Sequence, residues 1–232
     1  MKSLLLLLIF LILSCGRSDE LSDLSRIIGN NDLEQVVMDT DNDLLVKAIG
    51  RMRVGCTVTH IGGGIALTAG HCFSRSHFEG VEKARPCNVE RFRLVWGLAE
   101  GNQAPMPGKC KEIIAFEYNE RRDYAFLRVD PAPSSYLKLN FALPHLGEQI
   151  SIYSHPHKRP LEWSNYCQIE DIFGEHKDGL FVYSCDTEVG SSGAPIVNQN
   201  NEIIGLHSFY DDEIDRNGGM PLALLPSLNS IF

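Results

Sequence analysis

The sequence predicts an all-β protein built as a barrel or a sandwich. From Leu44 onward, short apolar runs alternate with turn residues, and none of them continues with a long 3.6-residue period. The 20 glycines and 11 prolines of the chain punctuate these runs. The second half shows the same alternation of short apolar runs and turn residues as the first half. The roughly 200 residues involved are enough for two small barrels.

Each apolar run is expected to form one strand. In the first half we expect strands at Val54–Val58, Gly64–Thr68, Phe92–Trp96, Ile113–Phe116 and Tyr124–Val129. In the second half we expect strands at Gln149–Tyr153, Tyr166–Ile172, Leu180–Ser184, Ala194–Asn198 and Glu202–His207. The C-terminal stretch Pro221–Phe232 is expected to end in one short helix.

The N-terminus predicts export. Lys2 precedes the apolar run Leu4–Leu13, which is too short for the ~20 residues of a membrane-spanning helix and matches the apolar core of a secretory signal peptide. The run ends in Ile-Leu-Ser-Cys, which resembles a bacterial lipobox and implies a lipid on Cys15. Because Gly16 is not the aspartate that retains many lipoproteins at the inner membrane, we expect the outer membrane or the cell surface. The alternative is an ordinary signal peptide cleaved nearby.

These features divide the N-terminal part into a signal peptide over residues 1–14 and a lipidated tether over residues 15–25. The formal net charge of −9 argues against binding to nucleic acid or to an anionic membrane surface, since both are themselves negative. Apart from the lipid anchor we therefore expect only protein or peptide partners, and we expect the protein to be a monomer.

The stretch most suggestive of chemistry is Asp186–Pro195, which places two serines between Gly190 and Gly193. We interpret Ser192 as a nucleophile. A serine hydroxyl needs a base that takes its proton and donors that stabilise the resulting oxyanion. Glycine allows main-chain N–H groups to converge, so the N–H groups of Gly190 and Ser192 would form the oxyanion hole. The alternative is a flexible linker, in which Gly-Ser-Ser-Gly is also common.

Two further stretches favour the catalytic interpretation. His71 follows the apolar run Leu67–Gly70, and Asp123 begins a strand-like segment. Histidine, aspartate and serine in this chain order are the triad order of the chymotrypsin-like enzymes. On these motifs the chain resembles the chymotrypsin-fold serine proteases, and within them the bacterial glutamyl endopeptidase-like branch, over residues 26–232.

The resemblance implies two Greek-key β-barrels, at about residues 45–138 and 139–225, with the active site at their junction. It also implies a serine endopeptidase without metal or cofactor. His71 would act as the base, Asp123 would orient it, and Ser192 would form the acyl-enzyme. One alternative is an inactive protease-fold lipoprotein that binds proteins. Another is an esterase, which would need a Gly-x-Ser-x-Gly motif and helices that the sequence lacks.

The chain has seven cysteines, so lipidation of one would leave six for disulfides, with fifteen possible connectivities. The resemblance implies Cys56–Cys72, the bridge of the histidine loop. Proximity in the sequence then suggests Cys167–Cys185 and Cys87–Cys110. The alternative of a zinc site has little support, because the sequence contains no Cys-x-x-Cys pair.

The segment Arg26–Asn30 resembles the activation junction of trypsin-like zymogens and also the mature start of glutamyl endopeptidases. Cleavage after Arg26 would release the domain from its anchor. The trypsin-type switch pairs the new amine with an aspartate just before the nucleophile. Ser191 occupies that position here, so that ion pair cannot form.

The resemblance to glutamyl endopeptidases also implies a substrate pocket for Glu or Asp at P1, the residue before the scissile bond. Counting from Ser192, the threonine and histidine that bind the substrate carboxylate correspond to Thr187 and His207. The alternative is that His207 is a core histidine. Phe209 and Tyr210 replace the small residues usual at this place, which would narrow the cleft.

The remaining histidines include the pair in His155-Pro156-His157 and His176. A metal site is one interpretation of these residues. We favour a surface loop that lines the second barrel, because the proline constrains the pair and no acidic ligands accompany it.

Overall fold

The computed structural model describes residues 25–74, 76–172 and 179–226. The expected signal peptide and Cys15 lie outside the described residues, as do His176 and residues 227–232 of the expected C-terminal helix. In the part of the chain that is described, no helix has the length and apolarity needed to cross a membrane.

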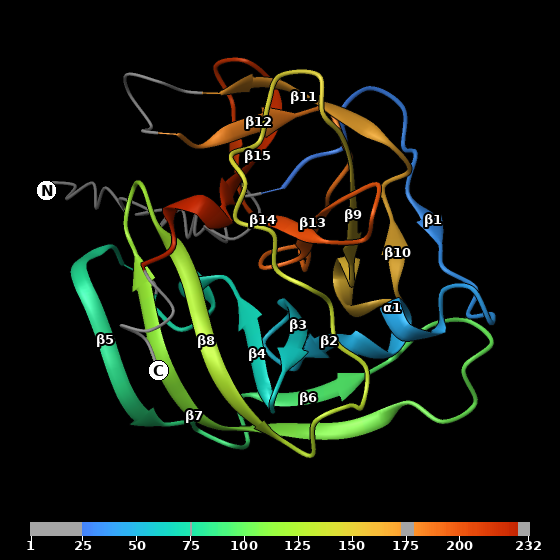
Figure 1. The fold of residues 1–232 in the computed structure, drawn as a ribbon, viewed down its shortest axis with the longest axis vertical. Coiled ribbons are helices and arrows are strands. Elements are labelled where there is room, and N and C mark those ends of the chain that lie inside the picture. Colours follow the sequence, from blue (N-terminus) through green and yellow to red (C-terminus); the bar gives the residue numbers. More distant parts are fainter. Residues whose placement is uncertain (1–24, 75, 173–178, 227–232) are drawn as a thin grey trace, which may run out of the picture.

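The first half of the chain forms a closed antiparallel barrel, in the lower part of Figure 1. Its strands follow the order β7-β6-β2-β3-β4-β8, and β8 pairs back with β7 to close the ring, while β5 adds to β7 as an edge strand. Irregular registers along β7 let this long strand bend between its partners. The strands are β2 (Ile49–Met52), β3 (Thr57–Gly62), β4 (Ile65–Thr68), β5 (Phe78–Pro86), β6 (Arg93–Trp96), β7 (Met106–Tyr118) and β8 (Asp123–Asp130).

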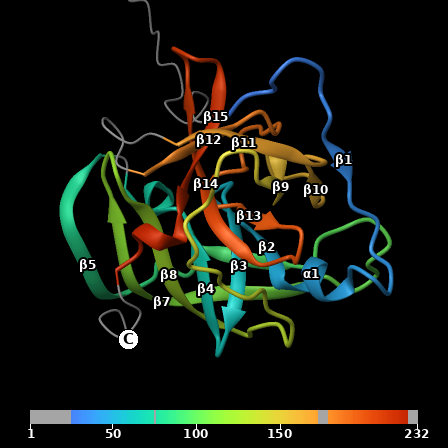
Figure 2. The same ribbon diagram turned by 45° about the horizontal axis from the view of Figure 1, so that its top comes forward.

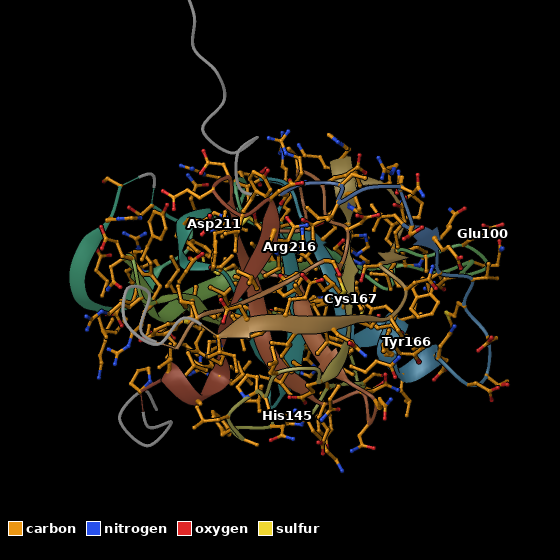
Figure 3. All side chains as sticks on the ribbon, turned by 90° about the horizontal axis from the view of Figure 1, so that it is seen from above. Glu100, His145, Tyr166, Cys167, Asp211 and Arg216 are labelled. Atoms are coloured by element: carbon orange, nitrogen blue, oxygen red, sulfur yellow. A yellow bond between two sulfur atoms is a disulfide. The ribbon has the colours of Figure 1, made fainter. Side chains whose placement is uncertain are left out.

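The second half forms the upper barrel, with the order β9-β11-β12-β15-β14-β13 and a closing pair between β13 and β9. Figure 3 labels Asp211 and Arg216, which are paired in the β14–β15 hairpin, and Cys167, which begins β11. The strands are β9 (Gln149–Ser154), β10 (Glu162–Trp163), β11 (Cys167–Ile172), β12 (Phe181–Tyr183), β13 (Pro195–Asn198), β14 (Ile203–Asp211) and β15 (Arg216–Pro221).

The predicted all-β class with two barrels is thus confirmed, and each barrel closes with six strands. The strand expected at Val54–Val58 is displaced, because Gly55 adopts φ +107° in a turn and β3 begins only at Thr57. The helix expected within the C-terminal stretch is, as far as it is described, a single 3₁₀ turn, η4 (Leu222–Leu224).

The apolar pattern of the sequence did not predict β1 (Glu34–Gln35), β2, β5, β10, β15 or the helix α1 (Asp43–Ala48). β15 escapes detection because Gly218 and Gly219 interrupt any apolar alternation. The structure explains both residues: a Cβ on Gly218 would lie 2.2 Å from the Phe209 ring, and one on Gly219 would lie 2.3 Å from Ile196. Tertiary packing therefore selects these glycines.

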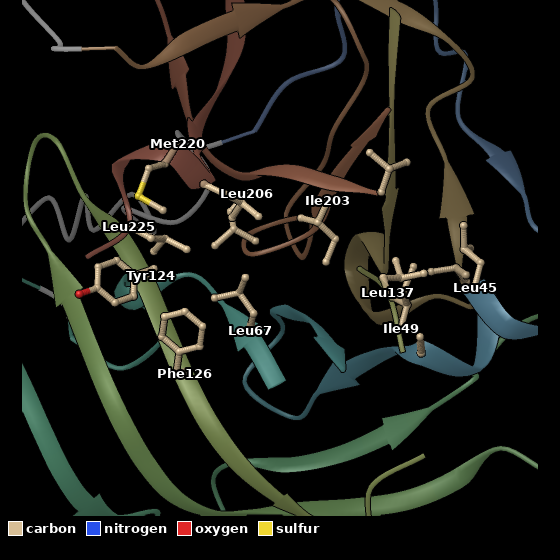
Figure 4. Close-up of a cluster of buried hydrophobic side chains, with 14 of the residues drawn as sticks. Leu45, Ile49, Leu67, Tyr124, Phe126, Leu137, Ile203, Leu206, Met220 and Leu225 are labelled. Carbon is tan, nitrogen blue, oxygen red and sulfur yellow. The ribbon is translucent and has the colours of Figure 1, made fainter. Parts of the chain in front are cut away.

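An apolar cluster joins the two barrels (Figure 4). Leu67 of β4 and Phe126 of β8 belong to it from the first barrel, and Leu206 of β14 and Met220 of β15 from the second. All four side chains are buried, and burial of such a side chain stabilises the fold by ~1.5–3 kcal/mol. The cluster packs strands of one barrel against strands of the other.

The N-terminal segment runs along the second barrel before the chain enters the first through α1 (Figure 2). β1 (Glu34–Gln35) pairs with β10, which places this segment at the edge of the second sheet. Further upstream, residues 25–32 contact the loop before Ser192, as described below.

Candidate active site

His71 and Asp123 form a buried pair at the junction of the barrels. His71 lies in the 3₁₀ turn η2 (Gly70–Cys72) after β4, and Asp123 is the first residue of β8, the strand that pairs with β4. His71 Nδ1 lies 2.7 Å from Asp123 Oδ2, and the His71 backbone N–H donates to Oδ1 at 2.8 Å. One carboxylate therefore fixes both the ring and the backbone of the histidine. Nδ1 donates in this arrangement, and Nε2 remains as the acceptor.

Ser208 completes the surroundings of Asp123, with its hydroxyl donating to Oδ2 at 2.5 Å. Burial alone would raise the pKa of Asp123. The His71 ring nearby and the hydrogen bonds from His71 and Ser208 overcome that effect and leave the pKa below its usual value. The carboxylate is thus charged at neutral pH, as an imidazolium partner requires.

Tight packing fixes the turn that carries His71. A Cβ on Gly70 would lie 2.1 Å from the carbonyl oxygen of Glu117, so only glycine fits there. The disulfide Cys56–Cys72 ties the residue after His71 to the start of β3. The structure also contains the pairs Cys87–Cys110 and Cys167–Cys185.

Ser192 comes from the second barrel but is anchored to the first. Its carbonyl oxygen accepts the backbone N–H of Thr57 at 2.9 Å. Gly193 has φ +77°, and a Cβ there would lie 2.2 Å from Thr68 Oγ1, so the backbone approaches β4 as only glycine allows. Ser191 is buried and donates its hydroxyl to Ser154 Oγ at 2.9 Å.

Two N–H groups around Ser192 are available for an oxyanion. Gly190 has φ +111°, and the carbonyl of Val189 accepts the His157 N–H at 2.6 Å. Because the peptide between Val189 and Gly190 is planar and trans, the Gly190 N–H points the opposite way. Within the described part of the chain, neither the Gly190 N–H nor the Ser192 N–H has a hydrogen-bond acceptor.

His71 Nε2 is buried and has no hydrogen-bond partner among the described residues. One ring nitrogen of His71 lies within 4.8 Å of the sulfur atoms of Cys56 and Cys72. Cys56 precedes Thr57, which binds the Ser192 carbonyl. Ser192 is thus linked to the His71–Asp123 pair through Thr57, Cys56 and the disulfide, and its hydroxyl forms no hydrogen bond with His71 Nε2. A loose contact between nucleophile and base is common in the absence of substrate.

The predicted pocket residues also lie together. Thr187 and His207 are fully buried, and two consecutive residues of the N-terminal segment reach both of them. The Arg26 N–H donates to Thr187 Oγ1 at 3.2 Å and to Asn217 Oδ1 at 2.9 Å, while the Ser25 hydroxyl lies 2.9 Å from His207 Nε2. Thr187 and His207 thus lie close enough together for two adjacent residues, Arg26 and Ser25, to contact one each.

Tyr183 determines which nitrogen of His207 carries the proton. Its hydroxyl donates to the carbonyl of Gly218 at 3.1 Å and lies 2.7 Å from His207 Nδ1. A phenol has a single proton, so Nδ1–H must be the donor in the second contact. In a neutral ring, Nε2 then accepts the Ser25 hydroxyl. Burial raises the pKa of Tyr183 well above its usual value, so the phenol stays protonated.

The segment expected to resemble an activation junction contacts Asp186. The Ile28 N–H donates to Asp186 Oδ1 at 2.7 Å, and the Asp32 N–H donates to Oδ2 at 2.6 Å. Burial raises the pKa of Asp186, although these two hydrogen bonds oppose the shift. The acceptor for this segment is therefore Asp186 at the start of the serine loop, whereas Ser191 takes no part.

The expectation of a surface loop at His155-Pro156-His157 is wrong for His155. This residue is fully buried below the serine loop, where its ring Nδ1 lies 3.0 Å from the Arg159 carbonyl, and burial lowers its pKa to about 4. His157 is exposed. Among the described residues, the only cluster of three side chains suited to a metal is Cys56, His71 and Cys72, and the disulfide occupies both of its sulfur atoms.

A family model described as a trypsin-like peptidase domain matches residues 55–206, which include His71, Asp123 and Ser192. The chain belongs to the trypsin-like peptidase family. The match ends one residue before His207, so the pocket histidine lies outside it.

Two relatives are named glutamyl endopeptidases. One, from Staphylococcus aureus (strain MRSA252), is 24% identical over 195 residues, covering 78% of this chain and 51% of the relative. The other, from strain MW2, is 30% identical over 97 residues, covering 41% and 27%. The chain thus spans about half or less of these relatives' length. A solved structure of a Glu endopeptidase in complex with MPD has a TM-score of 0.66 at 18% identity, covering 85% of this chain and 94% of that one, which supports the fold.

For this trypsin-like peptidase, sequence reasoning missed three residues of the site: Ser208, Tyr183 and Asn217. Ser208 directly follows His207, and that adjacency was a usable signal. Tyr183 and Asn217 come from β12 and β15, and they pair with each other across the sheet. Only the register of these strands brings them to the pocket, so no local pattern indicated them.

Proposed function

We propose that this protein is a serine endopeptidase that hydrolyses peptide bonds through His71, Asp123 and Ser192. The observation that carries the proposal is the buried pair of Asp123 and His71, joined at 2.7 Å, with Nε2 of the ring left as an acceptor without a partner among the described residues. Membership of the trypsin-like peptidase family supports it.

In the proposed mechanism, His71 Nε2 takes the proton of Ser192 while the hydroxyl oxygen attacks the substrate carbonyl. The oxyanion that forms accepts the N–H groups of Gly190 and Ser192, and Asp123 stabilises the imidazolium. His71 then protonates the leaving amine, which departs and leaves an acyl-enzyme. A water molecule, deprotonated by His71, releases the acyl group. All of these steps are proton transfers and acyl transfers that side chains can perform.

The proposed P1 preference is for Glu or Asp. Thr187 and His207 offer a hydroxyl and an imidazole N–H in a buried pocket, where a carboxylate is costly unless donors meet it. To donate from Nε2, His207 must either gain a proton or receive the Tyr183 hydroxyl at Nδ1. The second route gives up the hydrogen bond from Tyr183 to Gly218. The names of the two staphylococcal relatives support the same preference.

The protein is further proposed to be exported and anchored through a lipid on Cys15. The three disulfides among the described residues support export, because such bonds persist in oxidising compartments. In the intact chain, Ser25 and Arg26 occupy the Thr187–His207 pocket. Cleavage after Arg26 would free the domain from its anchor and would also allow this dipeptide to leave the pocket.

The test is covalent labelling of the protein purified from its membrane or secreted fraction, with its N-terminus identified by mass spectrometry. A fluorophosphonate probe should label Ser192, and Ser192→Ala should not be labelled. A peptide library should then report enrichment of Glu or Asp at P1. Labelling of another residue, or peptidase activity that survives Ser192→Ala, would refute the assignment.

A further inference from the structure

A cavity of about 290 Å³ lies beside Ser192 and is separate from the Thr187–His207 pocket. Its lining includes Ser192 and Gly190 but neither Thr187 nor His207. The opposite walls come from two other segments: Gly55 and Cys56 before β3, and His157 and Lys158 in the 3₁₀ turn η3 (Pro156–Lys158).

The position of this cavity identifies the part of a substrate that reaches it. In the proposed mechanism, His71 protonates the leaving amine, so that amine must lie close to the His71 ring. Cys56 lines the cavity, and its sulfur lies within 4.8 Å of a His71 ring nitrogen. A peptide whose P1 side chain enters the Thr187–His207 pocket must therefore continue past Cys56 into the cavity. The cavity receives the residues that follow the scissile bond.

One wall of this cavity carries a cation, Lys158, and no acidic residue lines the cavity, although the chain as a whole carries a net charge of −9. The Lys158 side chain crosses one wall, because a Cβ on Gly55 would lie 3.5 Å from Lys158 Cε. Among the described residues, no carboxylate pairs with the Lys158 ammonium. Arg51 adds a second cation close by, since its guanidinium donates to the Lys158 carbonyl at 2.5 Å.

Glu188, which directly precedes the lining residue Val189, pairs with Arg159 and not with Lys158. Its carboxylate forms an ion pair with the Arg159 guanidinium, which also binds Glu162 through two hydrogen bonds of 2.7 and 2.9 Å. His157 Nε2 lies 3.6 Å from Glu188 as well. Arg159 and the two carboxylates together carry one net negative charge, whereas Lys158 and Arg51 carry two positive charges. The ammonium of Lys158 therefore remains available to a ligand.

We propose that this cavity binds the acidic side chain of the first or second residue after the scissile bond, with Lys158 as the residue that selects it. The inference rests on the proposed function. It makes the preferred substrates acidic on both sides of the cleaved bond, with Thr187 and His207 selecting before it and Lys158 after it. Because Lys158 is exposed, the preference is modest, about two- to five-fold in kcat/KM for each such residue.

The test uses peptides with Glu at P1 that differ only by Glu or Gln at the first or the second position after the bond. The peptides extend several residues further and end in amides, so no terminal carboxylate competes. For the wild type, the ratio of kcat/KM for the Glu and Gln peptides should be about two to five at one of the two positions, and it should approach one at ~1 M salt. Lys158→Gln, which keeps the aliphatic stem, should bring the ratio to about one. Lys158→Glu should bring it below one.

Lys138→Gln is the matched control, because it removes one exposed lysine from the connection between the barrels and should keep the wild-type ratio. Each ratio compares two peptides on the same enzyme, so a variant that folds poorly lowers both values together. Fluorophosphonate labelling of Ser192 separates the two proposals. A ratio of one at both positions with a labelled wild type overturns the Lys158 assignment alone, as does an unchanged ratio in Lys158→Gln. Failure to label Ser192 overturns the proposed function.

Discussion

Replacing His207 by alanine tests most directly the pocket proposed to bind an acidic P1 side chain. Nε2 of His207 is the imidazole donor proposed for the substrate carboxylate, and a hydrogen bond to a charged group contributes ~1.5–3 kcal/mol. His207→Ala should therefore lower kcat/KM on a Glu-P1 peptide by roughly 10- to 150-fold. The same change should barely affect, or even improve, cleavage of a Gln-P1 or Leu-P1 peptide, because neither presents a charge to the pocket.

The structure indicates that this substitution leaves the Tyr183 hydroxyl with an acceptor, whereas the Ser25 hydroxyl loses His207 Nε2. Tyr183 loses its contact with Nδ1 but still donates to the Gly218 carbonyl at 3.1 Å. His207→Gln is the matched variant, because its amide can donate to a carboxylate and should recover part of the loss. Active-site titration with the fluorophosphonate corrects each rate for the folded fraction. An equal loss on Glu-P1, Gln-P1 and Leu-P1 peptides would show that His207 only supports the fold. A library profile without Glu or Asp enrichment at P1 would refute the pocket itself.

The remaining predictions concern catalysis, pH and the anchor. Ser192→Ala and His71→Ala should each abolish labelling and nearly all peptidase activity, and the double variant should be little worse, since the triad acts as one unit. The folded pKa of Asp123 lies below its unfolded value of about 3.9, so its contribution to stability is present above that pH and is lost as pH falls through the folded pKa. The free energy of unfolding, measured with denaturant, should therefore differ less between the wild type and Asp123→Asn below pH ~4 than above it. For Asp186 the folded pKa is raised, so its carboxylate form is disfavoured in the folded state. The free energy of unfolding of the wild type should therefore fall relative to that of Asp186→Asn as pH rises above ~4. Mass spectrometry of the native N-terminus should find diacylglycerol on Cys15, and an unmodified start between residues 14 and 20 would contradict the anchor.

The candidate triad could be predicted from the sequence because each member lies in a local pattern. His71 ends an apolar run, Asp123 begins one, and Ser192 lies beside two glycines that the backbone requires at φ +111° and φ +77°. The two barrels could also be predicted, since most of their strands are short apolar runs between turns. β5 could not, because its sequence is charged along much of its length and it lies at the edge of its sheet.

What could not be predicted depends on contacts between distant segments. The local sequence around His155 suggests a constrained surface loop, yet the carbonyl of His155 lies directly against Gly190, where an added Cβ would be 2.5 Å away. The turn after it supplies the His157 N–H that orients the Val189 carbonyl. The histidine is buried because the serine loop packs on it, and that packing has no signature in either segment alone.

The contacts of Ser25 and Arg26 would connect the proposed anchor with the proposed pocket. Their backbone and side-chain groups use Thr187, His207 and Asn217, the same donors and acceptors that a P1 residue would need. The contacts of Ile28 and Asp32 with Asp186 involve residues after the proposed cleavage point and would persist once the dipeptide has gone. Substrate must compete with Ser25 and Arg26 for the pocket as long as the chain is intact, because both cannot occupy one volume. A chain that is still attached to lipid should therefore cleave Glu-P1 peptides more slowly than the released domain.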